Sequence, residues 1–193
     1  MRIQLVISFV LLVALSPAVL ASESYRFDQS HSTIGFTVHQ FLGTTHGKFT
    51  KFDGKIDIDR EQPEKSSVTA KIDVRSIDTG IVKRDNHLRS PEFFNIAKFP
   101  VMTFKSRSVR QTGQQSGDIL GELTMHGIAK PITLHVKLLS TISGETKETR
   151  WAVTTEPLKR SDFKLMFSQG TEAISGISQT VAVNIEIEAS RVQ

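Results

Sequence analysis

The sequence predicts an all-β domain of about eight antiparallel strands with one short helical segment. Three observations lead to this fold class. Apolar and polar residues alternate in eight separate runs, short polar connections join consecutive runs, and one charged segment around residues 80–95 breaks the alternation. A period of two is typical of a strand that is buried on one face. Short connections favour antiparallel neighbours, because a parallel pair needs a long crossover.

The N-terminal segment, residues 1–21, reads as a secretory signal peptide. It has one early positive charge at Arg2, an apolar run from Leu5 to Leu15, and small residues around Ala21. The apolar run is shorter than the roughly 20 residues that a membrane-spanning helix needs, and the small residues favour cleavage. We therefore expect a periplasmic or secreted protein without stable membrane insertion, whose single domain is residues 22–193.

The composition of the remaining chain excludes several classes of protein. Removing 21 of 193 residues leaves 172, which suits one domain with a sizeable core. The chain has no Cys, so neither disulfides nor thiolate metal sites can stabilise it. Its net charge of +4 falls to +3 without Arg2, and its basic residues are interspersed with acidic ones. We expect a mixed-charge surface and no nucleic-acid partner.

The strands follow one another at regular spacing, separated by polar turns such as Asp53-Gly54 and residues 111–118. Eight antiparallel strands can form a sandwich or a closed up-and-down barrel. A closed barrel of eight strands either fills its interior with side chains or holds one small ligand. The eight runs are Ile34–Val38, Ile56–Ile58, Val68–Val74, Met102–Ser106, Ile119–Met125, Ile132–Leu138, Trp151–Val153 and Val181–Ile187.

The segment that breaks the alternation, residues 80–95, contains the stretch "KRDNHLRSPEFF". A helix over residues 81–88 could be capped by Asp78 or Thr79. Ser90 and Pro91 then supply the cap and first-position proline of a second turn. Such an element is able to close one end of a barrel.

Both faces of this predicted helix carry candidate functional residues. We expect its apolar residues to face the barrel, as a plug or in direct contact with a ligand. Arg84, His87 and Arg89 could meet a lipid headgroup, because arginine offers fork-shaped donors to phosphate. The alternative for Arg84 is an ion pair with Asp85 or with a rim carboxylate such as Asp162. The apolar residues are Ile81, Leu88, Phe93 and Phe94.

Five stretches of the chain together resemble a known family. They are "YRFDQSHSTIGFTVHQF", "GKFTKFDGKIDID", "SIDTGIVKRDNHLRSPEFFNIAKFPVMTFKS", "GELTMHGIAKPITL" and "KRSDFKL". In this order they look like the YceI-like family of secreted, lipocalin-like barrels. The resemblance implies an eight-stranded antiparallel up-and-down barrel with a short helical segment at one side. It also implies an apolar interior that binds polyisoprenoid or a related long-chain lipid, without catalytic residues. One departure is Lys164, where the family usually has Gly, so a backbone with positive φ would be strained there.

The aromatic residues suit a hydrocarbon ligand, although they could equally fill an ordinary core. The chain has 12 Phe but one Tyr and one Trp, so few of its rings carry a hydrogen-bonding group. In a homodimer, some of the residues that we expect to line the interior would form the interface instead. The expected lining residues are Phe36, Val38, Phe52, Ile72, Phe104, Leu123, Met125, Leu134 and Trp151, with Phe93, Phe94 and Phe163 near one end.

Two other functions remain open from the residues alone. A metal-dependent enzyme would require His31, His87 or His126 to converge with a carboxylate. No pair of histidines has the spacing of an H-E-x-x-H zinc site, so we expect no metal and no cofactor. The stretch "SDFK" at 161–164 matches the S-x-x-K pattern of serine acyl enzymes, but the companion motifs are missing. A structural or inhibitory binding module would have a barrel filled by its own side chains.

Overall fold

The computed structural model describes residues 22–41, 43–142, 148–167 and 176–192. The predicted signal peptide, residues 1–21, lies outside the described residues. Among the residues described, no helix is long and apolar enough to cross a membrane.

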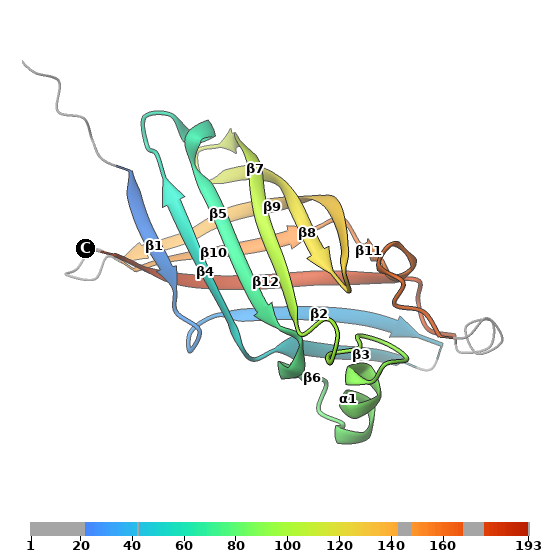
Figure 1. The fold of residues 1–193 in the computed structure, drawn as a ribbon. Helices are drawn as coiled ribbons and strands as arrows, with labels where there is room; N and C mark the ends of the chain where they lie inside the picture. The colour runs from blue at the N-terminus through green and yellow to red at the C-terminus, as the bar shows by residue number, and fades with distance from the viewer. Residues whose placement is uncertain (1–21, 42, 143–147, 168–175, 193) are drawn as a thin grey trace, which may run out of the picture.

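The described chain is mostly β-strand, as predicted, with one α-helix (Figure 1). The helix α1 covers Val82–Arg89, and three short 3-10 helices cover Pro63–Lys65, Val74–Ser76 and Arg160–Phe163. The strands are β1 (Glu23–Phe27), β2 (Thr33–Gln40), β3 (Gly43–Phe49), β4 (Phe52–Ile58), β5 (Ser67–Asp73), β6 (Ile77–Asp78), β7 (Val101–Gly113), β8 (Ser116–Met125), β9 (Ile128–Ile142), β10 (Glu148–Thr155), β11 (Leu158–Lys159) and β12 (Thr180–Arg191).

The strands form a closed antiparallel barrel. Hydrogen-bonded neighbours follow the order β1-β4-β5-β7-β8-β9-β10-β12, and β12 pairs with β1 to close the ring. The same edge of β12 also pairs with β2, which continues through β3 to β6. The fold is therefore the eight-stranded barrel that the sequence predicts, and not a sandwich.

Three of the eight barrel strands are interrupted, and the short β11 pairs with β12 outside the ring, which together explain the larger number of strand labels. β1 and β2 lie one after the other along β12, β3 and β4 form the next strand, and β5 and β6 the third. At the first interruption the Asp28 carboxylate accepts hydrogen bonds from the backbone N–H groups of Ser30 and His31. This side chain replaces the strand partners that the backbone loses there. Each interruption bends a strand without opening the barrel.

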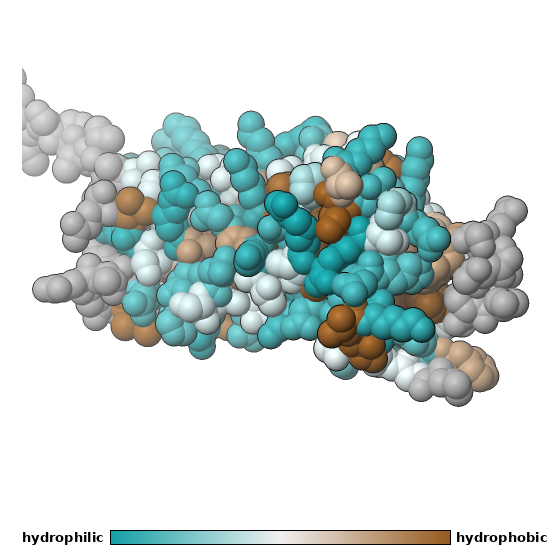
Figure 2. Space-filling model, turned by 60° about the horizontal axis from the view of Figure 1, so that its bottom comes forward, coloured by the Kyte–Doolittle hydropathy of each residue, from teal (hydrophilic) through white to brown (hydrophobic). Residues whose placement is uncertain are grey.

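The two faces of the barrel differ in polarity. Apolar side chains from all barrel strands point inward and form a single core cluster that includes Ile34, Phe104 and Ile187. Figure 2 shows that one outer face is mostly hydrophilic, with small separate apolar patches. The alternation in sequence thus translates directly into an apolar interior and a solvated exterior.

The helical segment is present, but its start differs from the prediction. Neither Asp78 nor Thr79 caps α1; Ile81 occupies the N-cap position and is 51% exposed, so it does not face the barrel. The Asp78 carboxylate accepts from the N–H of Gly80 instead. Thr79 donates from its N–H and hydroxyl to the buried carboxylate of Asp85. The turn at residues 80–81 therefore forms before the helix, and it turns Ile81 toward solvent.

Candidate functional site

The barrel encloses a cavity of about 600 Å³. Pockets that hold small molecules typically measure ~300–1,000 Å³. The wall is mostly apolar and takes residues from every strand of the barrel and from α1. Thirteen of the 14 residues predicted to bind a ligand lie in this wall: Phe36, Val38, Ile72, Arg84, His87, Phe93, Phe94, Phe104, Leu123, Met125, Leu134, Trp151 and Phe163.

Phe52 is the exception, and its prediction as a lining residue is corrected. It is the first residue of β4, directly after the interruption between β3 and β4, and it pairs in register with Ile72. Its side chain is buried in the core cluster but does not reach the cavity wall. The alternation predicts correctly that Phe52 points into the barrel. It does not distinguish a position in the packed core from a position in the cavity wall.

The wall also contains residues that the sequence prediction left out. Val136 lies on the same face of β9 as Leu134, and Ala70 lies on the same face of β5 as Ile72. Both residues lie on the apolar faces of the predicted runs Ile132–Leu138 and Val68–Val74, so listing every inward position of each run would have found them. Ile56, on the inward face of β4, is a third example.

Close packing of phenylalanine rings against glycines helps to keep the cavity open. A Cβ atom on Gly47 would lie 2.3 Å from the ring of Phe36, and one on Gly54 would lie 2.2 Å from the ring of Phe27. Both rings belong to the cavity wall. Because glycine has no side chain, each ring can lie close against the neighbouring strand. The glycines thus provide space for rings that would otherwise be displaced.

The end of the cavity beside α1 carries a polar cluster. Arg84 donates from Nε to the Thr79 hydroxyl at 2.7 Å, from Nη1 to the Thr45 hydroxyl at 3.1 Å, and from Nη2 to the Thr79 carbonyl at 2.8 Å. The Thr45 hydroxyl also accepts from the Gln40 side chain at 2.7 Å. Arg84, Thr45, Thr79 and Gln40 all line the cavity. The predicted alternative, an ion pair of Arg84 with Asp85 or Asp162, is not formed.

The other two polar candidates of this segment have different surroundings. His87 lines the cavity, its ring contacts Phe167 at 5.7 Å, and its Nε2 lies 3.1 Å from the Glu92 carboxylate. Arg89 instead donates to the carbonyls of Arg75 and Ile77 and lies outside the cavity wall. Arg89 therefore holds the segment against the preceding turn and does not reach the interior.

Arg160 is a wall residue that the sequence prediction did not consider. It is 5% exposed, and it donates to the backbone carbonyls of Ser178 and Leu165, each at 2.9 Å. Its guanidinium also lies 5.9 Å from the ring centre of Phe167. The motif "KRSDFKL" contains both Arg160 and Leu165, but the contact with Ser178 joins Arg160 to a segment 18 residues further along the chain. Local sequence does not reveal such contacts.

The opposite end of the cavity has a different polar lining. It is formed by Asp59 and Arg60 of the connection between β4 and β5, by Gln111 near the end of β7, and by Gln114 and Gln115 of the connection between β7 and β8 (Figure 1). The Arg60 guanidinium pairs with the Glu23 carboxylate at 2.7 Å. The hydrogen bond from Arg60 lowers the pKa of Glu23 below its usual value. The cavity is thus an apolar space between two polar ends.

Lys164 follows the short helix at Arg160–Phe163 and has φ of 56°, in the left-handed region. This is the conformation that glycine adopts without a steric penalty. Lys164 stands where the family usually has Gly, and its backbone has the positive φ that would explain a glycine there. Lys164 is accommodated there as the C-cap of the short helix.

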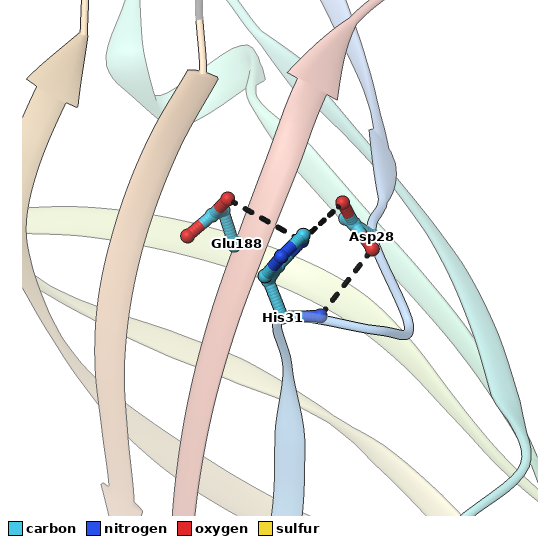
Figure 3. A group of neighbouring side chains, drawn as sticks. All are labelled: Asp28, His31 and Glu188. Carbon is cyan, nitrogen blue, oxygen red and sulfur yellow. Dashed lines mark hydrogen bonds and ion pairs between the residues drawn. The ribbon is translucent and has the colours of Figure 1, made fainter.

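The only group in the described part of the chain that could hold a metal lies outside the cavity wall. It consists of Asp28, His31 and Glu188, at the interruption between β1 and β2 (Figure 3). His31 Nδ1 lies 2.8 Å from Asp28 and 3.9 Å from Glu188, and Glu188 also pairs with Arg150 at 3.0 Å. The hydrogen bond that the His31 ring donates to the Asp28 carboxylate raises the pKa of His31. These contacts explain why the three side chains lie together, since they form an ion-pair network with Arg150.

Of the other two histidines in the enzyme hypothesis, His87 pairs with Glu92, and His126 hydrogen-bonds to the Phe163 carbonyl at 2.9 Å. The three histidines therefore have separate partners in the described structure. They do not form one site.

The fold and the cavity define a closed antiparallel barrel with an apolar interior, of the kind that encloses an apolar ligand. The YceI-like domain model matches residues 25–189, and the chain belongs to the YceI-like family. A UPF0312 protein of Ectopseudomonas mendocina is 34% identical over 176 residues, which cover 86% of this chain and 87% of that protein.

Solved structures show the same barrel. BcnA of Burkholderia cenocepacia superposes with a TM-score of 0.76 at 23% identity, covering 84% of this chain and 98% of BcnA. A polyisoprenoid binding domain from Saccharophagus degradans, implicated in plant cell wall breakdown, superposes with a TM-score of 0.63 at 22% identity. That match covers 87% of this chain and 98% of the domain.

Proposed function

We propose that this protein binds a long-chain amphiphilic lipid, a polyisoprenoid or a similar molecule, inside the barrel. The observation that carries the proposal is the cavity of about 600 Å³ with its mostly apolar wall. This cavity also argues against a barrel filled by its own side chains. The binding of polyisoprenoid by the structurally similar domain from Saccharophagus degradans is consistent with the proposal.

Burial of hydrocarbon supplies the binding energy in this account. Each buried CH₂ group contributes about 0.8 kcal/mol, so a five-carbon isoprene unit contributes about 4 kcal/mol before the costs of association. Two or three buried units are therefore enough to hold a lipid that water rejects. The apolar residues among the 13 predicted wall residues are proposed to make these contacts.

We propose a non-catalytic role in transport, storage or sequestration. In the described structure the cavity holds no group of histidines and carboxylates suited to catalysis. The features of residues 1–21 support export to the periplasm. The homodimer considered from the sequence stays a prediction.

A chain-length series tests the proposal with the protein's own fluorescence. Trp151 is the single tryptophan of the chain and lies in the cavity wall. Titration with geraniol, farnesol and geranylgeraniol should change its emission saturably. Affinity should rise about tenfold or more per isoprene unit until the cavity is full. The absence of saturable binding for all three alcohols would contradict the proposal.

A further inference from the structure

We propose that the end of the cavity beside α1 binds an anionic, oxygen-rich headgroup, such as a phosphate, and so orients the lipid in the barrel. This inference rests on the proposed lipid-binding function and adds the chemical class and the direction of the ligand.

The first argument is the distribution of charge along the wall. The end beside α1 contributes Arg84, Lys159, Arg160 and the ring of His87. Among the described wall residues the only carboxylate is Asp59, and it lies at the opposite end, in the connection between β4 and β5. In the described wall the basic side chains thus lie beside α1 and the carboxylate lies at the other end, and the apolar lining between them weakens the screening of these charges.

The second argument is the bonding of Arg84. Its three hydrogen bonds all go to neutral oxygens, those of Thr45 and Thr79, and no described carboxylate forms an ion pair with it. A guanidinium has five N–H donors, so one on each terminal nitrogen has no acceptor among the described residues. Inside an apolar cavity such donors favour an anionic acceptor, which gives charge-assisted hydrogen bonds.

The third argument is that Arg84 is held in place before any ligand arrives. The Asp85 carboxylate accepts from both the N–H and the hydroxyl of Thr79, at 3.0 and 2.5 Å, and Thr79 in turn accepts from Arg84 twice. Asp85 is buried but does not line the cavity. This chain of contacts positions the guanidinium at the cavity end while leaving its remaining donors available. A positioned donor loses little conformational freedom on binding.

The opposite end offers no comparable site. There Arg60 is already paired with Glu23, and the remaining groups are mainly neutral glutamine side chains beside Asp59. An anionic headgroup would meet the Asp59 carboxylate at that end. The headgroup is therefore expected beside α1, with the hydrocarbon chain extending toward the connections between β4 and β5 and between β7 and β8.

The test compares geranylgeranyl monophosphate with geranylgeraniol, which share one hydrocarbon chain, on the wild-type protein and on variants of α1. Arg84→Gln removes the charge inside the cavity, and Arg84→Lys retains it. Lys83→Gln is the matched control, because Lys83 precedes Arg84 on the same helix but is exposed and outside the wall.

The wild-type protein should bind the phosphate at least about tenfold more tightly than the alcohol. Arg84→Gln should abolish most of this preference while the affinity for the alcohol stays within about twofold. Arg84→Lys should keep part of the preference, and Lys83→Gln should keep all of it.

Equal wild-type affinity for the two ligands would overturn the headgroup inference and leave lipid binding intact. An equal loss for both ligands in Arg84→Gln would also overturn it, because Arg84 would then act on structure alone. If the wild-type protein bound neither ligand, the proposed function would fail together with this inference.

Discussion

Replacing Ala70 by phenylalanine should shorten the space available to a ligand. Ala70 lies in the cavity wall on β5, between Gly54 of β4 and Phe104 of β7 in the strand register. The new side chain adds six ring carbons to the interior. Displacing about six ligand carbons costs at most about 5 kcal/mol, at about 0.8 kcal/mol per carbon. The ligand can shift and recover part of this lost binding free energy. A remaining loss of about 2 kcal/mol lowers the affinity roughly 30-fold.

The assay is the titration of Trp151 fluorescence with geranylgeraniol. Thr69→Phe is the matched control, because Thr69 is the preceding residue of β5, is exposed, and lies outside the cavity wall. The affinity of Ala70→Phe for geranylgeraniol should fall about 30-fold or more. Its affinity for the shorter farnesol should fall by a smaller factor. Unchanged affinity in Ala70→Phe, or an equal loss in Thr69→Phe, would refute the assignment of this cavity as the binding site.

Three further predictions concern other parts of the molecule. Phe93→Asp should weaken geranylgeraniol binding by about 10-fold or more, since a carboxylate in the apolar wall disfavours hydrocarbon; Ile81→Asp, at an exposed position, should not. Lys164→Gly should stabilise the fold by about 0.5–1 kcal/mol in urea unfolding, because it relieves a positive φ. The pKa of His31 is raised above its ordinary 6.5 by Asp28, so stabilisation by the protonated ring is full below that value and disappears as pH rises through the folded-state pKa. His31→Asn should therefore cost more stability at about pH 6 than at about pH 9.

Each of these predictions has a clear contrary result. Full affinity in a folded Phe93→Asp variant would show that the helical segment does not contact the ligand. A loss of stability in Lys164→Gly would show that the lysine makes compensating contacts there. A stability difference for His31→Asn that does not change with pH would show that the ion pair with Asp28 contributes nothing measurable.

The sequence predicts the barrel well because strand alternation is a local property. Ile132 to Leu138 or Val181 to Ile187 can be assigned to a half-buried strand from a few consecutive residues. The interruption at residues 28–32 is not visible in this way, because it depends on the Asp28 carboxylate bonding to Ser30 and His31. Polar strands such as β3, with the sequence "GTTHGKF", show too little apolar alternation to be recognised.

The candidate site is predicted less completely, since its chemistry depends on residues far apart in the chain. Arg84 lies in the wall at the cavity end, but its bond to Thr45 spans 39 residues and cannot be read from local sequence. Arg160 was missed because a buried arginine depends on distant carbonyls, such as that of Ser178. Phe52 was wrongly assigned to the lining, because packing density does not follow from alternation.

Native mass spectrometry of the purified full-length protein, followed by organic extraction, tests the central claim most directly. The account predicts a mass in excess of the polypeptide that survives gentle ionisation and is removed by solvent. The extract should contain a long-chain lipid, and Ala70→Phe protein should carry less of it than Thr69→Phe protein. Repeated isolation of the bare polypeptide, with no lipid in the extract and none taken up from added geranylgeraniol, would contradict the account.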